Sequence, residues 1–191
     1  DLLDMAQIAI ISGGDWPQFE KQVIEQLPKN TVLQNLSILP TCGTKFYQYK
    51  KDWQKLYEEN FTDEERKSIL DNLQKAIKDA DLDIKKTWGD QIEDRGSQIT
   101  FSALGQKAPL EEKKDWDPNF SKRKKIVEPL QKTLKAFSIG MGGTTSIDIT
   151  KPGIDKAYGI QKLKDILKID INEMLFIGDA LFEGGNDHPA R

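Results

Sequence analysis

Residues 176–187 read FIGDALFEGGND and carry the strongest chemical signal in this 191-residue chain. An apolar run predicts a buried strand over residues 174–177, which would deliver Asp179 to its carboxyl end, the edge where open α/β sheets bind ligands. The glycines that follow let the backbone turn back and bring Asn186 and Asp187 to the same place. Two carboxylates and an amide form a hard oxygen site suited to Mg²⁺. The alternative is a surface loop of ordinary turn residues.

A hydroxyl and a pair of glycines follow the first apolar run. Ser12 ends the run over residues 5–12 and precedes Gly13 and Gly14. A hydroxyl and backbone N–H groups at a strand end, next to a helix start, can hold a phosphoryl oxygen. Ser-Gly-Gly is also common turn chemistry, and the position alone does not decide between the two.

Lys156 falls in the first turn of a helix expected over residues 155–167. A cation at a helix N-terminus opposes the helix dipole, which is mildly unfavourable. This suggests a role in neutralising phosphate and carboxylate charge. The alternative is an exposed lysine, one of 28 lysines and arginines in the chain.

The elements that must position these residues form a parallel α/β pattern at both ends of the chain. Residues 5–12 predict a buried parallel strand, and a helix over residues 17–27 keeps its apolar positions on one face. Two short strands are expected within residues 36–49. The helix over 155–167 and the strand over 174–177 complete this part.

The middle of the chain predicts an antiparallel α+β insert. A helix over residues 62–80 begins with Thr62 and Glu65, which are spaced as a capping box. Further along, we expect strands at 84–88, 91–94 and 98–104, a charged loop at 105–118, a helix to about residue 135, and a hairpin around Gly142 and Gly143.

The resulting organisation is a first core part over residues 1–45, a cap over residues 46–149 and a second core part over residues 150–191. An insert between two halves of an α/β core is a lid-over-site architecture. The basic run at residues 122–125 is interpreted as the solvated face of a helix rather than a nucleic-acid patch, because the whole chain is acidic.

Ser12, Lys156 and the acidic cluster, in that order and each at a strand or helix end, resemble the second, third and fourth motifs of the haloacid-dehalogenase (HAD) superfamily. The interval from Asp179 to Asp187, with Gly-Gly-Asn-Asp, is similar to its eukaryotic-type phosphomannomutase branch. Residues 92–106 and 142–156 are similar to cap strands of that branch and the return to its core. The resemblance covers nearly the whole chain and implies an α/β fold: a HAD-like Rossmannoid core with a parallel sheet, here truncated, and an inserted α+β cap with an antiparallel sheet plus two helices.

The resemblance also implies roles for residues of the cap. Arg95 would bind the distal phosphate of a phosphosugar, for which its planar fork is suited. Ser146 and Asp148 would bind the sugar. The alternatives are a salt bridge from Arg95 to a neighbour such as Glu93 or Asp94, and an outward hairpin position for Asp148.

Two cap positions depart from the family pattern. Gln106 and Lys113 stand where the branch has further arginines, and Lys113 is kept as a candidate substrate ligand. The loss of two guanidinium groups weakens the case for a mutase that handles a bisphosphate, whereas a phosphatase holds only one phosphate. The order Ser12, Gly13, Gly14 is also closer to sugar-phosphatase members than to the Gly-Gly-Ser usual in the branch.

The implied chemistry is Mg²⁺-dependent phosphoryl transfer on a phosphosugar through an aspartyl-phosphate. The nucleophile motif of the family, Asp-x-Asp-Gly, would lie before residue 1, and residues 79–83 lack its glycine. We therefore expect these residues to be part of a longer enzyme and inactive alone. The competing hypothesis is a non-catalytic phosphosugar-binding module. A nucleotide-binding dehydrogenase is disfavoured because no G-x-G-x-x-G follows a strand.

The composition bounds the setting in which this chemistry would occur. With 37% hydrophobic and 31% charged residues and a net charge of −3, the chain reads as globular and is not built to wrap nucleic acid or a membrane. A single cysteine, Cys42, excludes an internal disulfide and fits a reducing compartment. No apolar stretch approaches the ~18 residues of a membrane span. We expect a cytoplasmic protein whose partner is a small phosphosugar, and the family suggests a homodimer formed through the cap.

Overall fold

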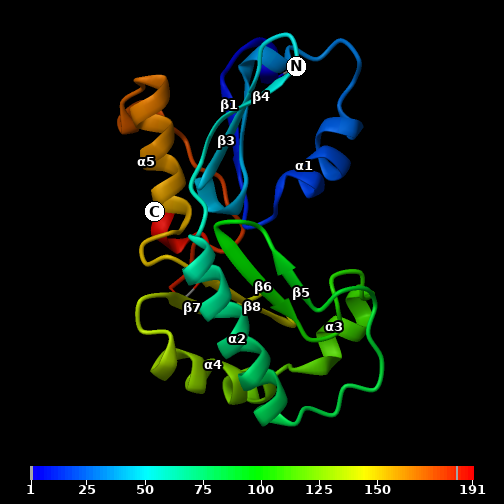
Figure 1. The fold of residues 1–191 in the computed structure, drawn as a ribbon. Helices are drawn as coiled ribbons and strands as arrows, with labels where there is room; N and C mark the ends of the chain where they lie inside the picture. The colour runs from blue at the N-terminus through cyan, green and yellow to red at the C-terminus, as the bar shows by residue number, and fades with distance from the viewer. Residues whose placement is uncertain (1, 184) are drawn as a thin grey trace. The chain divides into compact units, whose positions relative to one another are not determined.

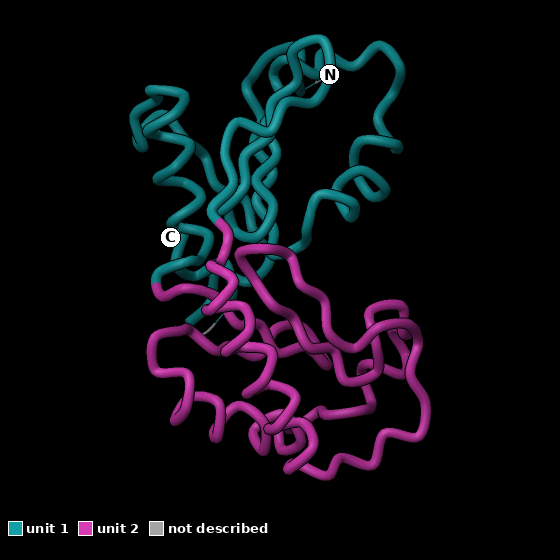
Figure 2. The backbone as a smooth tube through the Cα atoms, in the orientation of Figure 1, with its two compact units in different colours: residues 1–59, 153–191 teal, residues 60–152 magenta. Residues whose placement is uncertain are grey.

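The computed structural model describes residues 2–183 and 185–191. The chain forms two compact units, shown in Figure 2: unit 1 consists of residues 1–59 and 153–191, and unit 2 of residues 60–152. The first boundary lies later than residue 46, where the cap was expected to begin. The reason is that residues 46–59 are hydrogen-bonded into the sheet of unit 1.

The sheet of unit 1 has four strands in the order β1-β2-β3-β4. β1 (Ile8–Ile11) is parallel to β2 (Leu36–Leu39), as expected. β3 (Lys45–Tyr49) and β4 (Trp53–Glu58) extend the sheet by antiparallel pairing, and β4 was not predicted. β1 stands at the edge of this sheet and is only half-buried, rather than fully buried as expected.

Two helices pack on opposite faces of this sheet, because successive strand side chains point to opposite sides. Ile38 packs in one apolar cluster with Phe19 of α1 (Trp16–Gln22), and its neighbour Leu39 packs in another with Leu163 of α5 (Lys156–Leu167). Figure 1 shows α1 and α5 on either side of the strands. Unit 1 is therefore a layered α/β structure, as the sequence predicts.

Unit 2 contains an antiparallel sheet in the order β5-β6-β8-β7. Its strands are β5 (Ile92–Asp94), β6 (Gln98–Ser102), β7 (Ser138–Gly142) and β8 (Ser146–Thr150). The predicted hairpin about Gly142 is confirmed by the pairing of β7 with β8.

Helices α2 (Asp63–Ala80) and α4 (Ser121–Thr133) pack against each other in unit 2. The capping box is confirmed, since Thr62 and Glu65 exchange side-chain and backbone hydrogen bonds at the start of α2. The core between helices and sheet is apolar and includes Ile69, Leu73, Ile99, Phe101, Ile126, Leu130, Ile147 and Ile149.

Three predicted segments differ from the structure. Residues 84–88 form no strand. The Trp88 N–H donates to the Leu104 carbonyl and the Trp88 carbonyl accepts from the Lys107 N–H, so these groups are used in a turn. The expected loop over 105–118 contains helix α3 (Leu110–Trp116), anchored by buried Trp116.

The third difference concerns residues 174–177, which are extended but form no strand. Leu175 and Ile177 are 86% and 84% exposed, so the segment is not buried either. A strand is stabilised by hydrogen bonds to a neighbour, and no strand within residues 2–183 and 185–191 pairs with this segment. The remaining short elements are 3₁₀ turns at Leu2–Asp4, Ile24–Gln26, Leu33–Asn35, Thr41–Gly43, Ile171–Glu173 and His188–Ala190.

The fold class of each unit agrees with the predicted α/β fold. One unit has a sheet with a parallel pair of strands, and the insert is an antiparallel α+β structure. In the described part of the chain, no helix has the length and apolar character needed to cross a membrane.

Candidate functional site

The loop that follows β1 is held by backbone hydrogen bonds on both sides of Ser12. Its N–H donates to the Leu39 carbonyl at 3.3 Å, and its carbonyl accepts from the Cys42 N–H at 2.9 Å. The Ser12 Oγ accepts from the Gly14 N–H at 3.2 Å. A hydroxyl that accepts a hydrogen bond keeps its own proton to donate, so Ser12 is able to bind an anionic oxygen.

Helix α5 places Lys156 in its first turn, as predicted. The helix is capped by Asp155, whose Oδ1 accepts from the Tyr158 N–H at 3.0 Å. The Lys156 ammonium forms an ion pair with Asp187, 31 residues further along the chain. The Asp187 side chain is 1% exposed and that of Lys156 is 15% exposed. The structure therefore joins two of the predicted site residues in one buried pair.

The environment of Asp187 keeps its carboxyl group ionised. The hydrogen bond from Lys156 holds the pKa of Asp187 below its ordinary value, against the opposing effect of burial. The Ala180 N–H, which donates to Asp187 Oδ2 at 3.0 Å, lowers this pKa further. The carboxylate is thus fixed by one bond on each oxygen.

The segment around Asp179 folds closely around the Asp187 carboxylate. A Cβ at Gly178 would lie 2.6 Å from Asp187 Oδ2, so a larger residue there would displace this carboxylate. Asp179 itself is exposed, and so is Asn186. Of the loop that carries these residues, Gly184 lies outside the described residues.

Two glycines bring α5 against the turn that follows β2. A Cβ at Gly43 would lie 2.6 Å from the Cα of Gly159, which is one turn beyond Lys156 in α5. The same turn contains Cys42, whose N–H bonds to the Ser12 carbonyl. The Ser12 loop and the first half of α5 are therefore tied together within unit 1.

The acidic residues fit a magnesium site only in part. Among the described residues, no three His, Cys, Asp or Glu side chains gather as a metal site would require. Mg²⁺ is often bound through only one or two carboxylates while it keeps several waters. The exposed Asp179 carboxylate suits such an ion, whereas both oxygens of Asp187 already accept hydrogen bonds.

In unit 2, the sheet carries the predicted sugar ligands on one face. Asp148 Oδ1 accepts from Gln98 Nε2 at 2.9 Å and from Thr100 Oγ1 at 2.7 Å. Ser146 lies two residues before Asp148 in β8 and so shares its face. The structure brings these two residues together, and it adds Gln98 and Thr100, which the sequence did not single out.

The two basic candidates of unit 2 are held by neighbouring groups. Arg95 Nη2 lies 2.6 Å from Glu93 Oε2, the salt bridge that was the alternative interpretation of this residue. Lys113 Nζ donates to the Gln106 carbonyl at 3.2 Å.

A third basic residue of unit 2, Arg123, was predicted wrongly from the sequence. Arg123 belongs to the basic run expected to be solvated, yet its side chain is 1% exposed and pairs with Asp117 at 2.9 Å. Its Nη1 reaches the carbonyls of Gly142, Gly143 and Ser146. The spacing of Arg123 from Ile126, Val127 and Leu130 is helical, and this could have placed it on the buried face.

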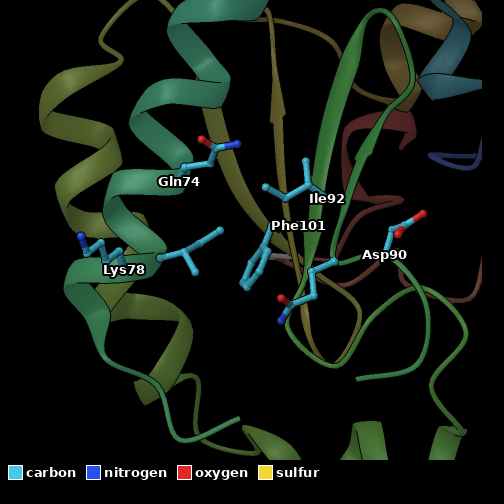
Figure 3. Close-up of a pocket in the computed structure, with 7 residues that line it drawn as sticks. Gln74, Lys78, Asp90, Ile92 and Phe101 are labelled. Carbon is cyan, nitrogen blue, oxygen red and sulfur yellow. The ribbon is translucent and has the colours of Figure 1, made fainter. Parts of the chain in front are cut away.

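A hollow in unit 2 lies apart from all of these residues. Figure 3 shows it between α2, which contributes Gln74 and Lys78, and the sheet, which contributes Ile92 and Phe101. Its volume is about 460 Å³. None of the residues predicted to carry chemistry lines it; the lining is Gln74, Ile77, Lys78, Asp90, Gln91, Ile92 and Phe101.

Solved structures of similar fold include a nucleotidase and a phosphatase. The Plasmodium falciparum IMP-nucleotidase aligns with a TM-score of 0.63 at 18% identity, over 100% of this chain and 50% of that one. The C-terminal domain of the Candida albicans trehalose-6-phosphate phosphatase aligns with a TM-score of 0.56 at 20% identity, over 88% of this chain and 53% of that one. At these identities the likeness shows the fold, which is the HAD-like core with an inserted cap.

Sequence relatives give a more specific result. The phosphomannomutase of Dendrobium officinale is 26% identical over 197 residues, covering 98% of this chain and 73% of that protein. That of Schizosaccharomyces pombe is 34% identical over 115 residues, covering 57% of this chain and 43% of that protein. The chain spans about half the length of the solved structures that it matches. A family model described as eukaryotic phosphomannomutase matches residues 1–190, and the chain therefore belongs to that family.

Proposed function

We propose that this protein is part of an enzyme that transfers a phosphoryl group of a phosphosugar, with Mg²⁺ and through an aspartyl-phosphate. The observation that carries this proposal is the buried pair of Lys156 and Asp187, enclosed by the loop that presents Asp179. Membership of the phosphomannomutase family supports the substrate class.

In this proposal the residues of unit 1 bind and orient the phosphate. The Ser12 hydroxyl donates a hydrogen bond to a phosphoryl oxygen. The Lys156 ammonium offsets negative charge on the same phosphoryl group. Asp187 positions the ammonium through their ion pair. Gly13 and Gly14 shape the loop, and Asn186 contributes an amide beside Asp187. Mg²⁺, when bound at Asp179, would offset repulsion between the phosphate and an attacking carboxylate.

Unit 2 acts as the cap in this proposal. The Asp148 carboxylate accepts hydrogen bonds from sugar hydroxyls, and the Ser146 hydroxyl accepts from them or donates to them. Gln98 and Thr100 already orient the Asp148 carboxylate on this face. Formation of a homodimer through the cap, and a cytoplasmic location, are part of the proposal.

The nucleophile must come from outside these 191 residues, since the sequence has no Asp-x-Asp-Gly. The proposal therefore predicts that residues 1–191 alone are inactive. The same observation favours the second candidate function, a phosphosugar-binding module without catalysis. An Asp-x-Asp-Gly strand in the flanking sequence would support the enzyme.

The test is Asp179→Ala in the protein as encoded, with whatever residues flank this chain. We expect Mg²⁺-dependent release or transfer of phosphate from a hexose monophosphate to be lost, with circular dichroism unchanged. Asp165→Ala is the matched control, because Asp165 is an exposed aspartate on α5. Turnover like that of the wild type in Asp179→Ala would remove the assignment.

A further inference from the structure

The loop between β1 and α1, which carries Ser12, is not held in place by side-chain packing around its first glycine. A Cβ added at Gly13 would meet no other atom within 4 Å. Glycine also has more backbone freedom than any other residue, and Gly14 follows directly. The position of the Ser12 hydroxyl therefore depends on the polar contacts that this loop makes with its neighbours.

The turn between β2 and β3 fixes the loop at two of its carbonyl groups. The Cys42 N–H donates to the Ser12 carbonyl at 2.9 Å. The Thr41 N–H donates to the Gly14 carbonyl at 2.9 Å. Thr41, Cys42 and Gly43 all have positive φ, of 49°, 57° and 92°. This conformation is unfavourable for a β-branched residue such as Thr41, so the turn is held in it by its surroundings.

Lys45 of β3 holds the end of the loop where α1 begins. Its ammonium lies 2.7 Å from Oδ1 of Asp15, and the same oxygen caps α1 by accepting from the Trp16 N–H at 2.8 Å. Glu58, opposite Lys45 in β4, lies 3.4 Å from the ammonium. The Lys45 side chain is only 7% exposed. The turn and Lys45 together thus hold the loop along its length.

We propose that Lys45 is a positioning residue, which acts through Asp15 to hold the Ser12 loop in the conformation that binds a phosphoryl group. This inference rests on the proposed function and adds to it a residue that does not itself contact the phosphate. An ion pair removed from water contributes little net stability, because desolvation cancels much of the attraction between the charges. What the pair of Lys45 and Asp15 supplies is a fixed geometry beside two glycines.

The expected signature is weaker phosphate binding with little change in the rate of the bound substrate. The contact from Ser12 is made before and during the reaction, so a displaced loop should raise KM rather than lower kcat. Lys45→Met keeps the length of the side chain and removes its charge. In the protein as encoded, the KM for mannose 6-phosphate should rise about tenfold and kcat should change by less than about threefold. The Mg²⁺ concentration that gives half-maximal rate should stay the same, because Asp179 lies on a different segment.

Two further variants separate positioning from a loss of folding. Lys55→Met is the matched control, because it removes an exposed ammonium that also pairs with Glu58 and leaves the pair of Lys45 and Asp15 intact. Its KM should equal that of the wild type. Asp15→Asn keeps an oxygen that is able to cap α1 and removes the charge that binds Lys45. It should raise KM as Lys45→Met does, and the double variant should be no worse than either single one, because both changes break the same contact.

Inorganic phosphate is a probe that needs no turnover. Its dissociation constant, measured by calorimetry beside a urea unfolding curve, should rise about tenfold in Lys45→Met and in Asp15→Asn. It should stay within about twofold of the wild type in Lys55→Met. Folded Lys45→Met and Asp15→Asn proteins that bind phosphate as tightly as Lys55→Met would overturn the inference and leave the proposed function intact. A wild type that neither binds phosphate nor acts on mannose 6-phosphate would overturn the proposed function, and the inference with it.

Discussion

Two ion pairs with a buried carboxylate, one in each unit, differ in how completely the cation is enclosed. In unit 2, Asp117 and Arg123 are 0% and 1% exposed, and the guanidinium also binds carbonyl groups of the β7–β8 hairpin. In unit 1, Asp187 is enclosed, but Lys156 keeps 15% of its side chain exposed.

The difference separates a structural pair from one that is able to bind a ligand. The guanidinium of Arg123 donates its hydrogen bonds to groups of the protein and so connects α4 to the β7–β8 hairpin. The Lys156 ammonium has three donors, and within the described residues Asp187 is its hydrogen-bond partner, so two protons remain for an anion. We therefore expect substitutions of Asp117 to affect folding and substitutions of Asp187 to affect catalysis.

The largest effect is expected for Asp117→Asn. It leaves the Arg123 guanidinium buried without a counter-charge, which should lower the free energy of unfolding by about 3–5 kcal/mol. Urea unfolding monitored by tryptophan fluorescence measures this change. Asp115→Asn, at an exposed aspartate in the same helix region, should stay within about 0.5 kcal/mol of the wild type. Equal stability of the two variants would show that the enclosed pair is not structural.

Asp187→Asn should lower kcat strongly and the free energy of unfolding only moderately. Loss of the charge that positions Lys156 is expected to lower kcat by about 10–100-fold, the range seen when a group that orients a catalytic residue is removed. The free energy of unfolding should fall less than in Asp117→Asn, because solvent still reaches Lys156. Steady-state kinetics of the protein as encoded, beside its urea unfolding curve, gives both values. A variant that lost stability but kept kcat would reverse the comparison.

Acid should weaken both pairs. Burial alone would raise the pKa of Asp117, but hydrogen bonds from Arg123 and from the N–H groups of Lys122 and Arg123 hold it below its ordinary value of 3.8. A carboxyl with a lowered pKa stabilises the fold at pH values above 3.8 and loses that contribution as the pH falls through its folded pKa. In urea unfolding from pH 7 to pH 2, the difference between wild type and Asp117→Asn should shrink below pH 3.8. A constant difference would contradict the shift.

The smallest effect is expected at an exposed cluster of unit 1. Glu59 binds the Tyr158 hydroxyl and the Lys162 ammonium, and the Glu59 side chain is 44% exposed. Exposed pairs contribute about 0.2–1 kcal/mol, so Glu59→Gln should change the free energy of unfolding by no more than this. Added salt should reduce the change further. A loss as large as that of Asp117→Asn would show that exposure does not rank these pairs.

The helices and hairpins were largely predictable, because their signals are local. The capping box of Thr62 and Glu65, the cap of α5 at Asp155 and the glycines of the β7–β8 hairpin act within a few residues. Helix α3 was missed even though Glu111 and Glu112 occupy its first turn, where acidic residues are favoured.

The contacts that decide the site were not predictable to the same extent. The motif order indicated that Lys156 and Asp187 belong to one site, but their direct pairing depends on how the chain returns after 31 residues. The apolar run over 174–177 has the composition of a strand, and whether it forms one depends on a neighbour that the run itself does not specify. The one sequence signal for the burial of Arg123 was its helical spacing from the apolar residues of α4.

The approach of Gly43 to Gly159 limits where α5 can lie against the turn that is bonded to Ser12. Because neither residue has a side chain, the backbone of α5 rests directly on the turn bonded to Ser12. A Cβ at Gly43 would lie 2.6 Å from the Cα of Gly159 and would push α5, with Lys156 in its first turn, away from this turn. The position of Lys156 relative to the Ser12 loop is therefore limited by two residues that bear no polar side chain and touch no ligand.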